Sequence, residues 1–455
     1  MTNISRQIFD GAKYTISFSM IQYMLFIVTQ VILARLISPE LFGEFAIIAI
    51  YVMFFFTLSN FNSDKFIIIS NKFDSHKFST IVKFDFIISL INYLFFFIII
   101  YNQILPNIDY QYKNHILLFG LIIFYHPLSR KKALLEKELD FFSARYPATI
   151  STLIASIFSI FLAFKGYPIL SLILWRLLQY LCESIILTFI KKVESGNKKS
   201  GEIKKLIKYS GPLLISNIII YFYWNIDYLI VEKLLGKEQL GFYWLAFQLG
   251  LFILRIKDSI INVVLPVYAD TKNKSLINKN FNQLSSLVFR TFAIIFIVFL
   301  FYGKSIFIYV FGYKWLPAYY PFLITIILSM IRSFTSFFEP ILLINNKTNY
   351  KLYLAILNAI LVPISVYYLV NLIGINGAPL GVLLSNIVSS SLLIFLTKDL
   401  VKIDFNKIIT PILILIFITL TFYLYELNWL LKIFILLLLI SFEILNARSK
   451  QKSEK

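Results

Sequence analysis

The sequence predicts an all-α polytopic membrane protein with about fourteen transmembrane helices. Of its 455 residues, 59% are hydrophobic and only 15% are charged, whereas about 25% of the residues in a soluble domain are charged. The apolar residues recur in runs of about 18 to 25, and each run is long enough to cross the ~30 Å hydrocarbon layer as a helix. The runs lack the alternation with a period of two that barrel strands show, so helices must satisfy the backbone groups within the membrane.

The apolar runs indicate where the expected helices begin and end. Boundaries read in this way hold to within a few residues. An even number of spans places both termini on the same side of the membrane. The expected helices cover residues 12–36, 42–62, 81–102, 115–132, 147–166, 169–192, 207–232, 240–267, 286–308, 318–345, 350–371, 375–397, 409–425 and 428–446.

Basic residues are distributed unevenly between the two sets of loops. About 30 Lys and Arg residues lie in loops and span ends on the side of the termini, and about 7 lie on the other side. The positive-inside rule therefore predicts that both termini are cytoplasmic. The net charge of +19 has a topological explanation. We expect membrane lipids as partners and no nucleic acid.

A basic segment near the middle of the chain divides the expected helices into two halves. We expect an N-terminal six-helix bundle (1–192), a cytoplasmic linker (193–206), a C-terminal six-helix bundle (207–398), and two extra helices with a basic cytoplasmic tail (399–455). An internal repeat supports this division, and repeats of this kind are typical of transporters. At an offset of 198 residues, VILARLISPELFGEFA (Val31–Ala46) matches LIVEKLLGKEQLGFYW (Leu229–Trp244), which pairs Arg35 with Lys233, Leu36 with Leu234, Glu40 with Glu238, Gly43 with Gly241 and Phe45 with Tyr243.

Polar and ionisable residues interrupt several apolar runs at helical spacing. They are costly in the hydrocarbon layer and usually face a partner or water. Two interpretations fit them: they line a hydrated cavity that binds a substrate, or they hold neighbouring helices together. The candidates are Arg176, Gln179, Tyr180 and Glu183 in 169–192; Tyr221, Trp224, Asn225 and Asp227 in 207–232; Gln248, Arg255 and Asp258 in 240–267; Arg290 in 286–308; and Ser329, Arg332, Ser333, Ser336 and Glu339 in 318–345.

The sequence carries no recognisable catalytic motif. It has no G-x-x-x-x-G-K-[ST] loop, no G-x-S-x-G and no H-E-x-x-H. The single cysteine, Cys182, excludes a disulfide or a paired-cysteine metal site within one chain. An enzyme is the alternative to a transporter, and a membrane O-antigen polymerase or glycosyltransferase is the kind of enzyme with similar hydropathy. Such enzymes typically have a long external loop, and the outer loops of this chain are too short to build one. We therefore expect a transporter with no catalytic site, cofactor or metal.

Several segments are similar to those of a known family. They are GAKYTISF from Gly11, ILARLISPELFGEFA up to Ala46, YSGPLLISN from Tyr209, NIDYLIVEKLLGKEQLGFY from Asn225, VFGYKWLPAYYPFLI from Val310 and IGINGAPLGVLLSNI from Ile373. Together they extend from residue 11 to about residue 390 and resemble the polysaccharide transporters, which are the O-antigen and capsule flippases of the multidrug/oligosaccharidyl-lipid/polysaccharide exporter superfamily.

The resemblance implies a V-shaped pair of six-helix bundles that works by alternating access. It implies a substrate too: an oligosaccharide on undecaprenyl pyrophosphate, moved from the cytoplasmic to the periplasmic leaflet of the bacterial inner membrane during O-antigen, lipopolysaccharide or capsule synthesis. A polysaccharide polymerase and a chain-length regulator are then possible partners. A cation-coupled drug exporter and a peptidoglycan-precursor flippase of the same superfamily are the alternatives.

These implications give the candidate residues provisional roles. Arg255 and Arg332 lie deep in their spans, and a guanidinium suits pyrophosphate because it donates paired, charge-assisted hydrogen bonds. The aromatic and amide side chains of helix 207–232 suit sugar rings and hydroxyls. Asp227 lies where the family often has an aspartate in its seventh helix. Asp227 and Glu339 are the candidates for proton or sodium coupling, whereas Arg176 and Arg290, nearer span ends, either contact the substrate or extend to the interface.

Overall fold

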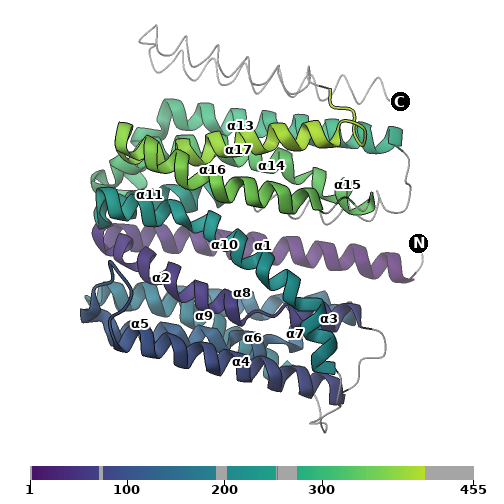
Figure 1. The fold of residues 1–455 in the computed structure, drawn as a ribbon. Coiled ribbons are helices and arrows are strands. Elements are labelled where there is room, and N and C mark those ends of the chain that lie inside the picture. Colours follow the sequence, from purple (N-terminus) through teal and green to yellow (C-terminus); the bar gives the residue numbers. More distant parts are fainter. Residues whose placement is uncertain are drawn as a thin grey trace. The chain divides into compact units, whose positions relative to one another are not determined.

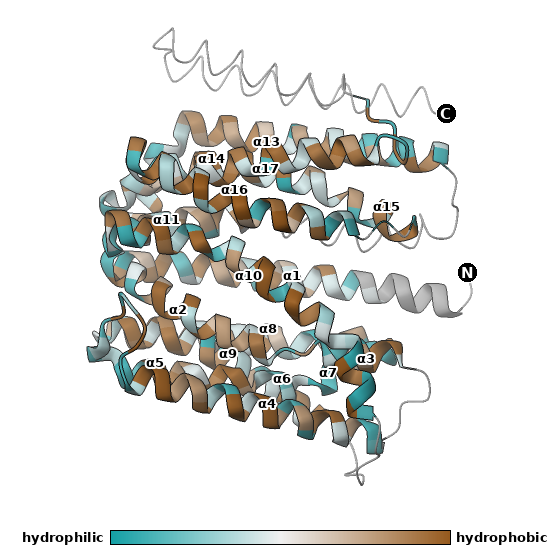
Figure 2. Ribbon diagram, viewed as in Figure 1, coloured by the Kyte–Doolittle hydropathy of each residue, from teal (hydrophilic) through white to brown (hydrophobic). Residues whose placement is uncertain are grey.

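The computed structural model describes residues 3–70, 75–190, 202–252, 254, 274–345, 347 and 349–404 (Figure 1). Within these residues every regular element is a helix, as the sequence predicts. Nine helical stretches in this part of the chain are long and apolar enough to cross a membrane, and Figure 2 shows hydrophobic residues along most of their length. The chain is therefore a multi-pass membrane protein. The predicted helices 409–425 and 428–446 lie outside the described residues, so the total of fourteen stays a prediction.

The helices follow one another with short connections. The first group contains α1 (Asn3–Leu36), α2 (Pro39–Ser59), α3 (Ser63–Ile69), α4 (Ser75–Tyr101), η1 (Tyr110–Tyr112), α5 (Lys113–Gly120), η2 (Leu121–Phe124), α6 (Tyr125–Ser129), α7 (Lys131–Lys137), α8 (Phe141–Phe164) and α9 (Pro168–Ile190). The second group contains α10 (Glu202–Leu235), α11 (Lys237–Phe252), α13 (Lys274–Phe311), η3 (Tyr313–Ala318), α14 (Tyr319–Ser336), α15 (Phe338–Ile344), α16 (Asn349–Ile373), η4 (Gly374–Asn376) and α17 (Gly377–Thr397).

The predicted span 115–132 is interrupted in the structure. A 3-10 turn, η2, separates α5 from α6, and Pro127 inside α6 has no amide hydrogen to donate to the preceding turn. Gly120 lies at the break, and a β-carbon added there would be 2.5 Å from Cε1 of Phe96. The close approach of α4 and the proline together bend this segment, whereas an apolar run alone predicts a continuous helix.

Local sequence explains the tight connection between α1 and α2. Ser38 is the N-cap of α2, and its hydroxyl accepts a hydrogen bond from the Leu41 amide at 3.5 Å. Pro39 follows at the first helical position, where its missing amide hydrogen costs nothing, and Glu40 lies in the first turn, where the helix dipole favours an acidic side chain. The equivalent connection between α10 and α11 turns at Gly236, whose φ is +86°, a conformation that glycine adopts without strain.

The packing of the chain defines two compact units. The first unit comprises Met1–Leu245 and Lys351–Val382, and the second comprises Ala246–Tyr350 and Leu383–Lys455. In the first unit, α8 packs against α9 and α1, α2 packs against α10 and α4, and α3 packs against α7. The two six-helix bundles of the sequence analysis, their V shape and the linker at 193–206 stay predictions, and residues 191–201 lie outside the described part of the chain.

The second unit has an aromatic core between α13 and the helices α14 and α15. The ring of Phe281 contacts those of Phe334 and Phe338 at centroid distances of 5.8 and 4.8 Å. Asn282 on α13 holds the segment after α17, because its side chain donates to the carbonyl of Lys402 at 2.8 Å and accepts from the amide of Asp404 at 2.7 Å. These contacts join the segment after α17 to α13.

Candidate functional site

One face of α9 carries four polar side chains, as the sequence predicts. Arg176, Gln179, Tyr180 and Glu183 have the spacing i, i+3, i+4 and i+7, so they share one side of the helix. Gln179 donates to the hydroxyl of Thr152 on α8 at 3.1 Å. The polar face of α9 is therefore turned toward other helices of the first unit.

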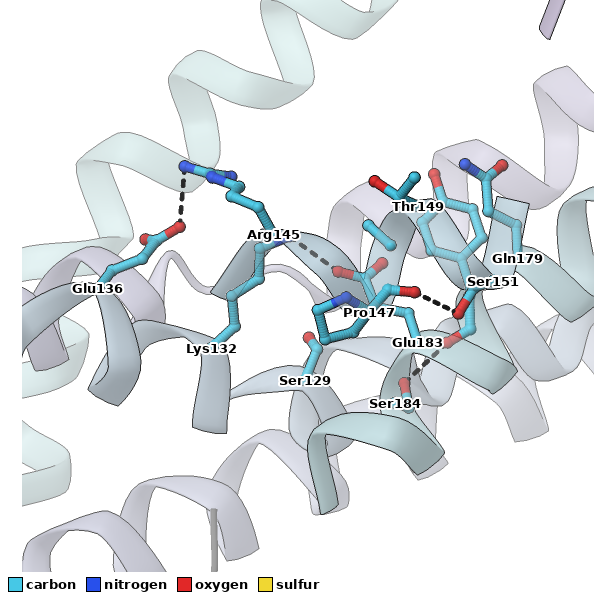
Figure 3. A network of polar contacts seen from close by, with 12 residues as sticks. Ser129, Lys132, Glu136, Arg145, Pro147, Thr149, Ser151, Gln179, Glu183 and Ser184 are labelled. Atoms are coloured by element: carbon cyan, nitrogen blue, oxygen red, sulfur yellow. Dashed lines mark hydrogen bonds and ion pairs between the residues drawn. The ribbon is translucent and has the colours of Figure 1, made fainter. Parts of the chain in front are cut away.

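Glu183 is the buried acid of this face, and its partner is a lysine from α7. Lys132 Nζ donates to Glu183 Oε1 at 2.8 Å, and only 4% of Glu183 is exposed (Figure 3). The hydroxyl of Tyr125 also lies near Glu183, and the Tyr125 ring meets the Tyr180 ring edge to face at 4.7 Å. A buried carboxylate is tolerated only with such partners, because desolvation of an unpaired charge is costly.

Further polar contacts surround this ion pair. Arg145 Nη2 lies 3.0 Å from Glu136 Oε1 (Figure 3). On α8, Pro147 has no amide hydrogen, and the hydroxyl of Ser151 donates to the Pro147 carbonyl at 2.7 Å. Gln22 of α1 donates to Thr149 at 2.9 Å. The network thus joins α7 with amides, hydroxyls and charges to α1, α8 and α9, which are candidate membrane spans.

Arg176 lies beside aromatic rings at the other end of the α9 face. Its guanidinium carbon is 5.1 Å from the ring centroid of Trp175 and 5.9 Å from that of Phe26, and the two rings stack at 5.5 Å. Arg176 is only half-buried. A planar cation held over aromatic rings is well suited to bind phosphate oxygens, because its hydrogen-bond donors lie around its edge.

A second buried ion pair lies in the first unit outside this face. Arg130 Nε is 2.6 Å from Asp85 Oδ2, and the hydroxyl of Ser63 donates to the other oxygen of Asp85 at 2.7 Å. Arg130 is 3% exposed and Asp85 is 0% exposed. Because both side chains are withdrawn from water and paired, this pair has a packing role and is a poor candidate for substrate binding.

The predicted residues of α10 lie in different environments. Asp227 is 1% exposed and accepts a hydrogen bond from the hydroxyl of Tyr243 on α11. Tyr221 donates to the Ile50 carbonyl of α2, and Asn225 donates to the Tyr221 carbonyl at 2.8 Å. Trp224 is 49% exposed. Trp224 is the member of this group with the most surface for a ligand.

The predicted residues of the second unit are only partly accessible. Ser329 and Ser333 are buried, and the hydroxyl of Ser329 donates to the Gly250 carbonyl at 2.8 Å. Arg332 is half-buried, and its Nε donates to Asn386 Oδ1 at 3.3 Å. Glu339 and Arg290 are half-buried. Arg255 lies outside the described residues, and a substrate contact by any of these side chains stays a prediction.

The repeated segments meet each other within the first unit. A β-carbon on Gly43 would lie 1.8 Å from the carbonyl oxygen of Lys237, and one on Gly241 would lie 1.8 Å from the carbonyl oxygen of Pro39. The contact is reciprocal at the offset of 198 residues, because Lys237 is the repeat equivalent of Pro39 and Gly241 that of Gly43. Such reciprocity is what two segments related by a local two-fold axis produce.

Charged and aromatic side chains reinforce the glycine contact. Glu44 is 3% exposed, its Oε2 lies 2.5 Å from Lys237 Nζ, and its Oε1 accepts from the Asp109 amide at 3.0 Å. The Trp244 ring contacts Phe42 at 5.7 Å and Phe45 at 5.9 Å. We call this contact between the starts of α2 and α11 the glycine closure.

Four charged residues of these contacts are not among the sequence-predicted candidates: Lys132, Glu44, Asp85 and Arg130. Glu44, Asp85 and Arg130 fall inside predicted spans, where the cost of a charge in the hydrocarbon layer is a signal that identifies them. Lys132 lies at the end of the predicted span 115–132, where a lysine is expected for topology alone. Its role depends on the pairing of α7 with α9, which no local pattern encodes.

Known proteins share the fold of this chain. A family model described as "Polysaccharide biosynthesis protein" matches residues 32–320. A solved structure of the lipid II flippase MurJ in an inward closed conformation has a TM-score of 0.77 at 15% identity and covers 95% of this chain and 99% of that chain. An inward-facing multidrug resistance MATE family transporter of the MOP superfamily has a TM-score of 0.59 at 14% identity, covering 85% of this chain and 97% of that chain.

A third structure, the MATE multidrug transporter DinF-BH in complex with R6G, has a TM-score of 0.58 at 12% identity and covers 90% of this chain and 97% of that chain. No curated protein sequence matches the chain. At these identities the structural likeness establishes the fold, which is that of flippases and exporters.

Proposed function

The chain belongs to the polysaccharide biosynthesis protein family, as its motifs indicate, and on this premise we propose that it is a flippase for an undecaprenyl-pyrophosphate-linked oligosaccharide. The substrate is an O-antigen or capsule repeat unit. It moves from the cytoplasmic to the periplasmic leaflet of the bacterial inner membrane, and both termini of the flippase are cytoplasmic. The family match and the exporter fold support translocation rather than catalysis.

The polar face of α9 is the observation that carries the proposal. It combines Arg176, which suits a phosphate, with the amide of Gln179 and the hydroxyl of Tyr180, which suit the hydroxyls of a sugar. Lys132 and Thr152 already contact Glu183 and Gln179, so half-buried Arg176 is the member of this face that we propose as the contact for the pyrophosphate. Arg332 and Arg255 are our further candidates for binding the pyrophosphate.

In this proposal the glycine closure seals the outer end of the pathway. The start of α2 and the start of α11 touch through backbone atoms at Gly43 and Gly241, so the contact is either made in full or lost. Alternating access requires that it open when the sugar leaves. An inside-negative potential assists the outward movement of the anionic headgroup by about 2.3 kcal/mol per charge per 100 mV.

Coupling and partners complete the proposal. Asp227 and Glu339 are the candidates for proton or sodium coupling. A polysaccharide polymerase and a chain-length regulator receive the flipped unit.

The test reconstitutes the full chain in liposomes that contain a lipid-linked oligosaccharide. A sugar-modifying reagent added outside the liposomes reacts only with the oligosaccharide in the outer leaflet and so reports flipping. We expect flipping by the wild-type protein and a loss of at least tenfold with Arg176→Ala or Arg332→Ala, because removal of a charge-assisted contact costs about 1.5–3 kcal/mol. Liposomes with lipid II or with a cationic dye test the two alternatives from the same superfamily. Flipping of lipid II but not of the oligosaccharide would overturn the proposed substrate.

A further inference from the structure

Two neighbouring helices of the first unit expose isoleucines beside lysines. α3 and the first turns of α10 pack against each other. The exposed fractions are 37% for Ile68 and 57% for Ile69 on α3, and 38% for Ile203 and 47% for Ile207 on α10. Apolar side chains left uncovered next to exposed charges are typical of segments that lie at a membrane interface. The exposed lysines on the two helices are Lys65, Lys204, Lys205 and Lys208.

The inner faces of both helices are fixed by packing. Ile67 and Leu206 are each 0% exposed and belong to one apolar core. The Phe66 and Tyr209 rings lie 5.7 Å apart. Lys137 of α7 caps the end of α3, because its Nζ donates to the Ile67 carbonyl at 3.0 Å. Burial, with Lys77 nearby, lowers the pKa of Lys137. These contacts hold the outer faces of the two helices in place.

The position of the two helices specifies what surrounds those faces. α3 ends the candidate span Pro39–Ile69, and the first turns of α10 begin the candidate span Glu202–Leu235. Both segments therefore lie where the hydrocarbon layer meets the headgroups. There, isoleucine side chains enter the acyl boundary while lysine stems extend toward phosphate oxygens.

The charge on this surface is predominantly positive. Glu202 is 8% exposed, and its carboxylate forms ion pairs with Lys205 at 3.1 Å and Lys77 at 3.8 Å. Asp64 contacts Arg130 at 3.4 Å. Lys65, Lys204, Lys205 and Lys208 are exposed, and the partly exposed carboxylate of Asp64 is the acidic group beside them. An anionic membrane surface is complementary to these positive charges.

We propose that α3 and residues 202–208 of α10 form a platform that binds the headgroups of anionic phospholipids. The occupant is a lipid with a phosphodiester and no compensating cation, such as phosphatidylglycerol. The platform is separate from the polar face of α9 and does not depend on the proposed substrate.

The test is lipid retention by the purified full chain, measured by native mass spectrometry after exchange into phosphatidylglycerol or phosphatidylcholine. We expect the wild-type protein to retain phosphatidylglycerol preferentially. A triple variant, Lys65→Gln with Lys204→Gln and Lys208→Gln, should lose this preference by about fivefold per lysine. A matched control, Lys113→Gln with Lys165→Gln and Lys304→Gln, removes the same charge elsewhere and should keep the preference. An equal loss in both variants, or no loss in the first, overturns the proposal.

A second measurement locates the isoleucines. The variant Ile207→Cys in a Cys182→Ser background, labelled with a fluorophore and placed in phosphatidylglycerol vesicles, should be quenched by a nitroxide on the upper acyl chain and shielded from aqueous iodide. Quenching by iodide alone would show that this face is in water or open to a soluble partner, and would overturn the platform even if the lysine variants behaved as expected.

Discussion

Replacement of Gly43 by alanine tests the glycine closure directly. The added methyl group would lie 1.8 Å from the carbonyl oxygen of Lys237, whereas ordinary contacts begin at 3.4 Å, so the two backbones would have to separate by about 1.6 Å. The obstacle is main chain, which cannot rotate away as a flexible side chain would. Overpacking of this kind costs about 1–3 kcal/mol, which corresponds to a shift of about 5- to 150-fold in favour of the open state.

The assay is the rate at which a membrane-impermeant maleimide labels a buried cysteine near the closure. Ala46 is 0% exposed and lies one turn beyond Gly43 on α2, so Ala46→Cys in a Cys182→Ser background reports opening. We expect Gly43→Ala to raise the labelling rate about tenfold, within the range above. The matched control is Gly211→Ala on α10, where no atom lies within 4 Å of the added carbon, and labelling should not change.

The reciprocal geometry adds a stricter requirement. Gly241→Ala places its methyl group 1.8 Å from the Pro39 carbonyl oxygen, so each single variant breaks the same contact. The double variant should therefore open little further than either single variant, because the effects of coupled sites are not additive. An unchanged labelling rate in Gly43→Ala, or independent effects of the two glycines, would refute the reasoning that this contact is a single closure.

Three further predictions concern stability in detergent, measured as the loss of folded protein on heating. Lys132→Ala should destabilise by about 3–5 kcal/mol, because it leaves the Glu183 carboxylate buried without its cation; adding Glu183→Gln should recover most of the loss, and no recovery would exclude the ion pair as the cause. Asp85→Ala should cost a similar amount, because buried Arg130 then keeps only its 3.4 Å contact with Asp64, and the pair Asp85→Leu with Arg130→Met should restore stability. Ser38→Ala should cost no more than about 1 kcal/mol, since its capping bond is long at 3.5 Å; a larger loss would show a role beyond capping.

Much of the fold was predictable because the membrane imposes simple rules on the sequence. An apolar run must be helical and must have a minimum length, so the predicted helices 350–371 and 375–397 lie close to α16 (Asn349–Ile373) and α17 (Gly377–Thr397). The rule does not predict helices that are stabilised by tertiary contacts. The seven residues of α3 include charges and form no apolar run, and their helix depends on Lys137, whose partner carbonyl at Ile67 is 70 residues away.

The candidate site was predictable to the same extent. The spacing of Arg176, Gln179, Tyr180 and Glu183 places them on one face of a helix whatever surrounds it. Their partners were not predictable, because Lys132 is separated from Glu183 by 51 residues, and its approach depends on how α7 packs against α9. Local periodicity specifies the face of a helix, and long-range packing specifies what that face meets.

The glycine closure combines a symmetric element with an asymmetric one. The backbone contacts of Gly43 and Gly241 follow the repeat, but the ion pair does not, because the repeat equivalents of Glu44 and Lys237 are Phe242 and Pro39. Symmetry therefore sets the geometry of the contact, while the buried carboxylate of Glu44, with Lys237 at 2.5 Å, contributes stabilisation from one half only. Since these two contributions reside in different residues, a change at Glu44 alters how strongly the closure holds without altering its shape. Under the alternating access that we propose, Glu44 therefore adjusts the opening equilibrium while the glycines define the closed state.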